Sequence, residues 1–132
     1  LPAKEGGKPT KQPYFIHGTD GEPLAVAGLW ATWRDRALAE SDPDAPWLHS
    51  CTIITTSANA TMEPIHDRMP VLLPQSKWAE WLDPNNRDLA SLTGLLVPAS
   101  DGLLEMHPVS TDVNNVRNKE PHLIDLVDEA VG

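Results

Sequence analysis

The sequence is poor in cysteine, tyrosine and phenylalanine, and it lacks a long apolar run. Cys51 is the single cysteine among the 132 residues, so an intrachain disulfide is impossible and a reducing compartment is favoured. No apolar run approaches the roughly 18–20 residues that cross a bilayer. No basic and hydrophobic leader opens the sequence either. We therefore predict a cytoplasmic protein that does not contact a membrane.

Basic residues are also scarce. Ten Lys and Arg stand against 19 Asp and Glu, which gives a net charge of −9 and a pI near 4.8. Broad binding to nucleic-acid phosphates needs clustered cations, and this balance argues against it. The acidic residues concentrate in segments 35–44 and 125–129, which leaves room for a local basic surface elsewhere.

The strand-like runs are short and numerous. The chain length suits one domain, and a hydrophobic content of 40% is typical of a globular chain. Runs rich in β-branched and aromatic residues predict strands at 13–17, 24–30, 47–56 and 103–109. The first two flank the turn-forming segment 18–21 and predict a β-hairpin. Gly28 predicts a bulge or a close backbone approach, and Pro108 confines the last strand to an edge or a bulge.

Two short helices are predicted in the second half of the chain. Trp78, Trp81 and Leu82 recur at i, i+3 and i+4, which is the spacing of one helix face. Asn86 can cap a second helix that Gly94 ends. Together with the strands, these helices predict an α+β fold that is rich in β structure, with a mixed, barrel-like sheet.

Segment 51–73 carries the densest polar chemistry. It begins with an apolar, β-branched run and presents His66, Asp67 and Arg68 just before a second apolar run. Two prolines flank this triplet and stiffen its backbone, which suits a preorganised group. His66 can transfer protons near neutral pH. The alternative is a half-buried histidine that is hydrogen-bonded to the sheet.

The other polar residues of the segment admit two interpretations each. Arg68 can bind a phosphate or carboxylate through two N–H groups, but the residues alone favour an ion pair with Asp67 or Glu63. Thr55 ends a strand, where its hydroxyl can meet a ligand, and ordinary β-propensity explains it equally well. Cys51 opens an apolar strand and is predicted to be an inert, buried thiol.

No metal or cofactor motif is present in the sequence. The five histidines are scattered, without HxH, HExxH or paired cysteine spacing. A Gly-rich phosphate loop and a GxSxG elbow are both absent. We therefore predict neither a metal nor a cofactor.

Several motifs follow one another in a defined order. They are PYFIH (13–17), AGLW (27–30), IITTSAN (53–59), IHDRMPVLL (65–73), WL (81–82) and HPVSTDVNNVRN (107–118). This order resembles the SOS response-associated peptidase family, the SRAP domain, from about residue 13 to residue 118. The combination of the HDRMP and VNN blocks is the most specific part of the resemblance.

The resemblance implies a compact, β-rich SRAP-like α+β fold that senses abasic sites in single-stranded DNA. In this family an N-terminal cysteine forms a thiazolidine with the ring-opened sugar, and the same cysteine is linked to autoproteolytic removal of the residues ahead of it. The resemblance assigns proton transfer to His66, a DNA phosphate contact to Arg68 and a place on the DNA path to Thr55. It predicts a thiol autopeptidase with crosslinking, lyase-like activity in the DNA damage response, found at the nucleoid when bound to DNA.

The family's nucleophilic Cys, active-site Asn and Glu have no counterpart in these residues, and Cys51 does not match the nucleophile position. We therefore expect residues 13–132 to form the C-terminal part of a single SRAP-like domain, behind a polar loop or terminus at 1–12. The expected partners are the N-terminal part of the same domain and single-stranded DNA with abasic sites. We expect this chain alone to be inactive and the protein to be a monomer.

Two other functions stay open. One is a noncovalent single-stranded-DNA-binding or regulatory module that lacks the nucleophile. The other is a small-molecule hydrolase that uses His66 and Asp67. The sequence upstream of Leu1 distinguishes the covalent from the noncovalent function, and an ester or amide substrate screen without DNA detects the hydrolase.

Overall fold

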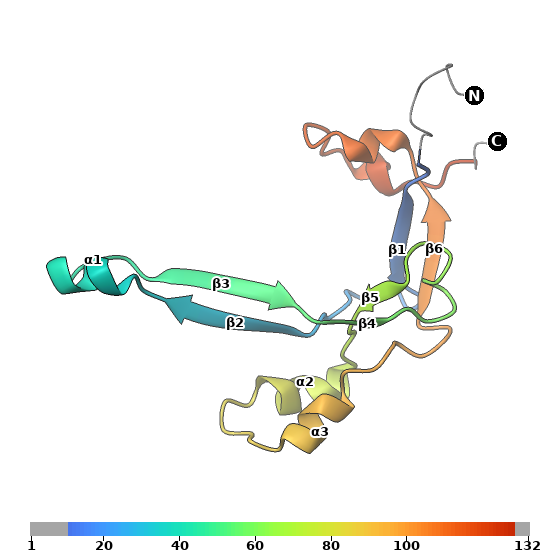
Figure 1. The fold of residues 1–132 in the computed structure, drawn as a ribbon. Helices are drawn as coiled ribbons and strands as arrows, with labels where there is room; N and C mark the ends of the chain where they lie inside the picture. The colour runs from blue at the N-terminus through green and yellow to red at the C-terminus, as the bar shows by residue number, and fades with distance from the viewer. Residues whose placement is uncertain (1–10, 129–132) are drawn as a thin grey trace. The chain divides into compact units, whose positions relative to one another are not determined.

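The computed structural model describes residues 11–128, which divide into two compact units (Figure 1). Residues 11–23 and 102–128 belong to the first unit, and Leu24–Asp101 form the second. Most of the predicted polar segment 1–12 therefore lies outside the described residues. The prediction of a single domain stays a prediction.

An antiparallel strand pair organises the first unit. β1 (Tyr14–Gly18) pairs with β6 (Leu104–Pro108) in a register that places Phe15 opposite His107. Two short 3₁₀ helices follow, η1 (Thr111–Asn114) and η2 (Pro121–Ile124). In the part of the chain that the structure describes, β6 pairs only with β1, so the predicted edge strand is confirmed.

The predicted hairpin between residues 13–17 and 24–30 is wrong. The turn itself forms, because Gly21 N–H donates to Gly18 O over 3.0 Å. β1 nevertheless pairs with β6, and the second run enters a different strand pair. A turn sequence dictates a local change of direction, whereas a strand's partner depends on side chains that can lie far away in sequence.

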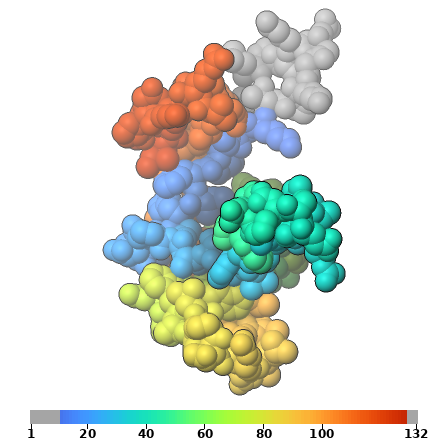
Figure 2. All heavy atoms as spheres, turned by 90° about the vertical axis from the view of Figure 1, so that its left-hand side faces the viewer, coloured from blue at the N-terminus to red at the C-terminus, as the bar shows by residue number. Residues whose placement is uncertain are grey.

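The second unit contains a long β-hairpin. β2 (Gly28–Trp33) pairs with β3 (Leu48–Ile53), and the short helix α1 (Arg36–Ser41) lies at its tip, which faces the viewer in Figure 2. The Asp35 side chain caps α1 by accepting the N–H groups of Ala37 and Leu38. The sequence did not predict α1, because six residues are too few to show a helical hydrophobic period.

Gly28 lies where two backbones approach each other closely. A Cβ atom at this position would lie 2.9 Å from Thr52 O, closer than real Cβ contacts come. The predicted close backbone approach at Gly28 is therefore confirmed.

The core of the second unit forms where three extended segments meet. Ala27 N–H donates to Val71 O, Ile54 N–H donates to Ala27 O, and Val71 N–H donates to Ile54 O, each over 2.9 Å. Ala27 and Val71 are fully buried, and Leu73 is nearly so. The partly buried side chains of Ile54, Trp81, Leu95 and Leu96 pack against them. This core fixes the two chain segments that carry the candidate site.

The two predicted helices are confirmed. In α2 (Gln75–Leu82), Trp81 packs on the core, and Trp78 is partly exposed and donates its indole N–H to Leu73 O over 2.9 Å. The second helix is α3 (Leu89–Gly94).

The cap of α3 differs from the expected one. The Asp88 carboxylate accepts Ser91 N–H over 3.1 Å, while the Asn86 side chain accepts Asp88 N–H over 2.9 Å. Asn86 therefore shapes the turn that precedes α3, and the N-cap is Asp88. The prediction of Asn86 as the cap is wrong.

The mixed α and β content with short helices is confirmed, but the barrel-like sheet is not found. The described residues form three two-stranded antiparallel sheets, of which the third pairs β4 (Thr55–Ser57) with β5 (Arg68–Pro70). A barrel closes only when every strand has a neighbour on both sides, and between residues 11 and 128 each sheet ends after two strands.

The helices are short in the part of the chain that the structure describes. None of them combines the length and the apolar character that crossing a bilayer requires.

Candidate functional site

The candidate site lies on the short pair β4–β5 and on the loop that joins its strands. The register places Thr55 opposite Pro70 and Ser57 opposite Arg68. At the base of loop 58–67, Ala58 N–H donates to Asp67 O over 2.9 Å. This hydrogen bond extends the β4–β5 pairing by one residue pair, so it holds the two ends of the loop together.

Arg68 and Thr55 contact each other directly. Arg68 Nη2 donates to the Thr55 carbonyl oxygen over 2.7 Å and to the Thr55 hydroxyl over 3.0 Å. Among residues 11–128 Arg68 forms no ion pair, so the expected pairing with Asp67 or Glu63 is wrong. The exposed guanidinium is held in place by oxygens without a formal charge, which leaves its positive charge available to an anion.

His66 presents an exposed imidazole beside Arg68. The Arg68 backbone N–H donates to His66 Nδ1 over 3.0 Å, and Asp67 Oδ1 lies 3.0 Å from the same nitrogen. About two thirds of the His66 side chain, 65%, is accessible, so the alternative of a half-buried histidine is wrong. Its Nε2 has no hydrogen-bond partner within the described part of the chain.

The two partners of Nδ1 favour different protonation states. Nδ1 accepts the Arg68 N–H only when it carries no proton, and it donates to Asp67 only when it does. Each protonation state of Nδ1 therefore allows a hydrogen bond to one of its two neighbours, and Nε2 stays accessible for proton exchange. This arrangement suits a group that both accepts and donates protons.

Three predicted site residues are thus brought together. Hydrogen bonds join Thr55 of β4 to Arg68 of β5, and Arg68 to His66 at the end of the loop between them. The surface that results carries an exposed imidazole, a cation and a hydroxyl. Residues 11–128 contain no group of three or more His, Cys, Asp or Glu side chains arranged to hold a metal ion.

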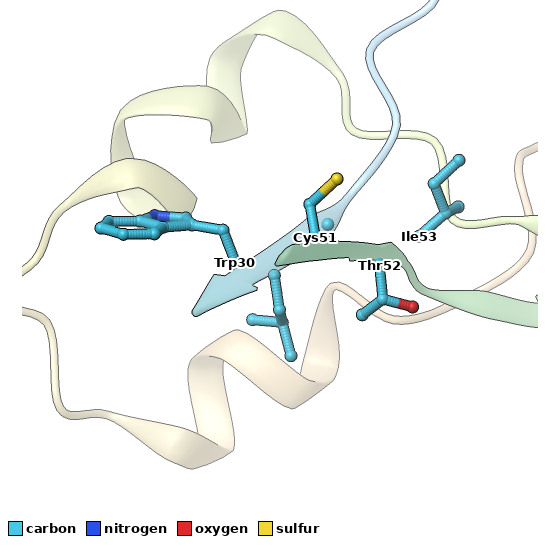
Figure 3. A pocket seen from close by; sticks show the side chains of 6 residues that line it. Trp30, Cys51, Thr52 and Ile53 are labelled. Atoms are coloured by element: carbon cyan, nitrogen blue, oxygen red, sulfur yellow. The ribbon is translucent and has the colours of Figure 1, made fainter. Parts of the chain in front are cut away.

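Cys51 lies away from these residues, on the β2–β3 hairpin. It is exposed, so the prediction of a buried thiol is wrong. Cys51 and Trp30 are opposite each other in register and extend from the same face of the strand pair, whereas Thr52 extends from the other face (Figure 3). They line a shallow, open hollow together with Gly28, Leu29, Thr52 and Ile53. No described helix or sheet covers either face of this strand pair, so even its apolar side chains are accessible to solvent.

Sequence reasoning missed Asn59 as a residue that supports the site. Its side chain is buried, accepts Met62 N–H over 3.1 Å and donates to Ala99 O over 3.1 Å. The signal was an asparagine two residues after a strand, where its side chain can bond a backbone N–H group a few residues later.

Residues 3–116 match the family model for the SOS response associated peptidase (SRAP). The chain belongs to this family. The resemblance inferred from the motif order is therefore confirmed, and the SRAP match includes Thr55, Asn59, His66 and Arg68.

Two relatives of the chain carry names that state an activity. The chain is 40% identical over 116 residues to the abasic site processing protein YoqW of Bacillus subtilis, which covers 88% of this chain and 49% of YoqW. It is 33% identical over 127 residues to the abasic site processing protein YedK of Escherichia coli, covering 94% of this chain and 52% of YedK. This SRAP chain thus spans about half the length of these relatives.

A solved structure agrees with the fold. A protein from Bacteroides thetaiotaomicron superimposes with a TM-score of 0.73 at 26% identity, covering 89% of this chain and 49% of that protein.

Proposed function

We propose that this SRAP chain supplies the proton-transfer and phosphate-binding part of a protein that processes abasic sites in single-stranded DNA. The observation that carries the proposal is the exposed, hydrogen-bonded series of Thr55, Arg68 and His66. The names of YoqW and YedK as abasic site processing proteins support the choice of substrate.

The reaction that fits this surface is the formation of a thiazolidine crosslink. The nucleophile is an N-terminal cysteine supplied by the part of the domain that lies outside these residues. Its α-amine attacks the sugar aldehyde, the resulting carbinolamine loses water, and the thiol adds to the same carbon. In sum, one aldehyde, one amine and one thiol yield one thiazolidine and one water. Removal of residues ahead of that cysteine is a separate hydrolysis that consumes one water.

His66 acts on the proton transfers of this sequence. As an imidazolium, it gives its Nε2 proton to the departing hydroxyl of the carbinolamine and keeps a proton on Nδ1. Asp67 Oδ1, 3.0 Å from Nδ1, accepts a hydrogen bond from that remaining proton. Because the accessible Nε2 carries out the transfer, Nδ1 keeps its proton and its hydrogen bond to Asp67 throughout.

Arg68 and Thr55 bind the DNA backbone next to the lesion. The bonds to Thr55 occupy Nη2, and within residues 11–128 no hydrogen bond occupies the other guanidinium nitrogens, which can bind a phosphate oxygen. One or two such contacts are compatible with a net charge of −9, since a covalent bond and not counterion release holds the DNA.

The remaining part of the domain packs on the β2–β3 hairpin in this proposal. Large apolar side chains there are more than half exposed, with Trp30 reaching 78%. The full set is Leu29, Trp30, Trp33, Trp47, Leu48 and Ile53. An apolar surface on both faces of a strand pair is typical of an interface. The length difference between this chain and its relatives supports the same arrangement.

The experiment uses the complete protein that carries this chain and a single-stranded oligonucleotide with one abasic site. We expect a complex that survives denaturing electrophoresis. A matched oligonucleotide with a tetrahydrofuran site, which has no aldehyde, should give none. His66→Ala should slow formation of the complex by about 10²–10⁴-fold, the usual contribution of general acid–base catalysis, without loss of secondary structure.

Each other outcome has a defined meaning. Binding to DNA without a denaturation-resistant complex supports the noncovalent module and overturns the crosslinking proposal. An unchanged rate in His66→Ala removes His66 from the mechanism.

A further inference from the structure

His66 is connected to the core of its unit through a short series of backbone hydrogen bonds. His66 N–H donates to Met62 O over 3.0 Å, and Met62 N–H in turn donates to Asn59 O over 3.1 Å. Glu63 N–H also donates to Asn59 O, over 3.0 Å. The position of His66 therefore depends on how firmly Asn59 is held.

Asn59 is held by both ends of its side-chain amide. Oδ1 accepts Met62 N–H over 3.1 Å, and Nδ2 donates to Ala99 O over 3.1 Å. Asn59 is only 7% exposed, and Ala99 is also buried. The amide thus fastens the start of loop 58–67 to a segment 40 residues further along the chain.

The partners dictate which way the amide points. A flipped side chain would place Nδ2 against the Met62 N–H donor and Oδ1 against the Ala99 carbonyl, and both contacts would be repulsive. The site thus requires one acceptor and one donor at fixed places. An aliphatic residue supplies neither, and an ionised aspartate supplies only the acceptor.

We propose that Asn59 is a positioning residue for His66. It acts through Met62 and holds the His66 ring where Nδ1 meets the Arg68 N–H and Asp67. This inference rests on the proposed function, in which His66 transfers protons. It assigns to a buried amide control over the rate of the chemical step.

The experiment is a double-mutant cycle in the complete protein. Asn59→Leu should slow single-turnover crosslinking to abasic-site DNA by about 100-fold, the effect of a misplaced reacting group. In a His66→Ala background, Asn59→Leu should slow the reaction by less than about 2-fold, since the group it positions is already gone. Affinity for undamaged single-stranded DNA serves as the binding readout and should change little.

A conservative variant tests the donor requirement. Asn59→Asp at neutral pH presents two oxygens and repels Ala99 O, whereas a protonated carboxyl supplies both an acceptor and a donor. Its rate relative to the wild type should therefore recover as the pH falls toward the range in which that carboxyl takes up a proton. Asn59→Leu should show no such recovery.

The control for general destabilisation is Trp78→Phe, which removes the indole hydrogen bond to Leu73 O in the same unit without touching loop 58–67. Equal slowing by Asn59→Leu in the wild-type and His66→Ala backgrounds would overturn the inference and make Asn59 a purely structural residue.

A readout without DNA separates this inference from the proposed function. Amide hydrogen exchange at Met62 and His66 should accelerate by about 10-fold or more in Asn59→Leu, which corresponds to 1.4 kcal/mol or more of lost local protection. If the wild type forms no crosslink at all, the proposed function fails while the exchange data still decide whether Asn59 holds the loop. Unchanged exchange at both amides would overturn the positioning role.

Discussion

Arg68 is an exposed cation whose orientation is fixed by neutral groups. Its Nη2 donates to the carbonyl and hydroxyl oxygens of Thr55, so the guanidinium is held without losing its net charge to a carboxylate. A phosphate that meets this group finds a donor already oriented, which reduces the side-chain entropy lost on binding.

Replacement of Arg68 by Gln should weaken noncovalent binding of single-stranded DNA and lower its salt dependence. If Arg68 contacts one phosphate, the slope of log K against log salt concentration should decrease by about 0.7. Fluorescence anisotropy over a series of salt concentrations measures this slope. Arg87→Gln, in the turn between α2 and α3, is the matched control and should leave it unchanged. Equal slopes for wild type and Arg68→Gln would show that Arg68 meets no phosphate.

At the scale of single residues, the sequence predicted well which side chains share the site. It predicted less well which hydrogen-bond partners they have. His66 and Arg68 are close in sequence, so their proximity follows from the chain. The bond from Arg68 to Thr55 depends on the pairing of β4 with β5, which the residues alone did not indicate. An ion pair with Asp67 or Glu63 therefore looked more favourable than it is in the folded chain.

At the scale of elements, Glu80 connects α2 to α3. Its carboxylate accepts a hydrogen bond from Lys77 Nζ over 2.8 Å and another from the Ser91 hydroxyl. The Lys77 hydrogen bond, followed by that of Ser91, lowers the pKa of Glu80 below its usual value of 4.5. A lowered pKa means that the folded state favours the carboxylate, so this link stabilises the helix pair above pH 4.5 and is lost as the pH falls through the folded-state pKa.

Glu80→Gln should therefore destabilise the protein at neutral pH and matter progressively less in acid. Urea unfolding of both proteins from pH 7 down to pH 3 gives the difference in free energy of unfolding at each pH. We expect this difference to be constant above about pH 5 and to shrink below it. Glu40→Gln on α1 is the control. A difference that does not vary with pH would mean that the charge of Glu80 contributes nothing to the link.

Helices were easier to predict than strand pairs, and the reason is physical. The Trp78–Trp81–Leu82 spacing that identifies α2 is contained within the helix itself. β1 instead finds its partner in β6, which starts 86 residues after β1 ends: Gly18 faces Leu104 in the register. No local pattern carries that information, so the hairpin prediction followed the nearer turn.

At the scale of the whole molecule, the described residues leave much apolar surface without a cover. The β2–β3 hairpin accounts for a large share of it, including Trp30, Cys51 and Ile53. The sequence predicted a larger sheet because strand-like runs are frequent. It could not show that residues 11–128 pair their strands only two by two.

If the rest of the SRAP domain covers this hairpin, Cys51 should be protected in the complete protein. We expect alkylation of Cys51 by iodoacetamide to be slow under native conditions and fast in urea, as measured by mass spectrometry of the peptide that contains it. A cysteine introduced by Ala37→Cys, on the exposed α1, should react quickly in both conditions. Rapid native labelling of Cys51 would show that the hairpin stays uncovered in the complete protein.

The close approach at Gly28 bears on how the hairpin keeps its alignment. Apolar residues lie exposed on both faces of β2–β3, so burial distinguishes poorly between the observed pairing and one shifted by a residue. A Cβ atom at the Gly28 position would lie 2.9 Å from Thr52 O, so a residue with a Cβ atom brought there by a one-residue slip would collide with the β3 backbone. Gly28 thus disfavours a shifted register, and the observed register is the one that places Trp30 opposite Cys51 on one face of the hairpin.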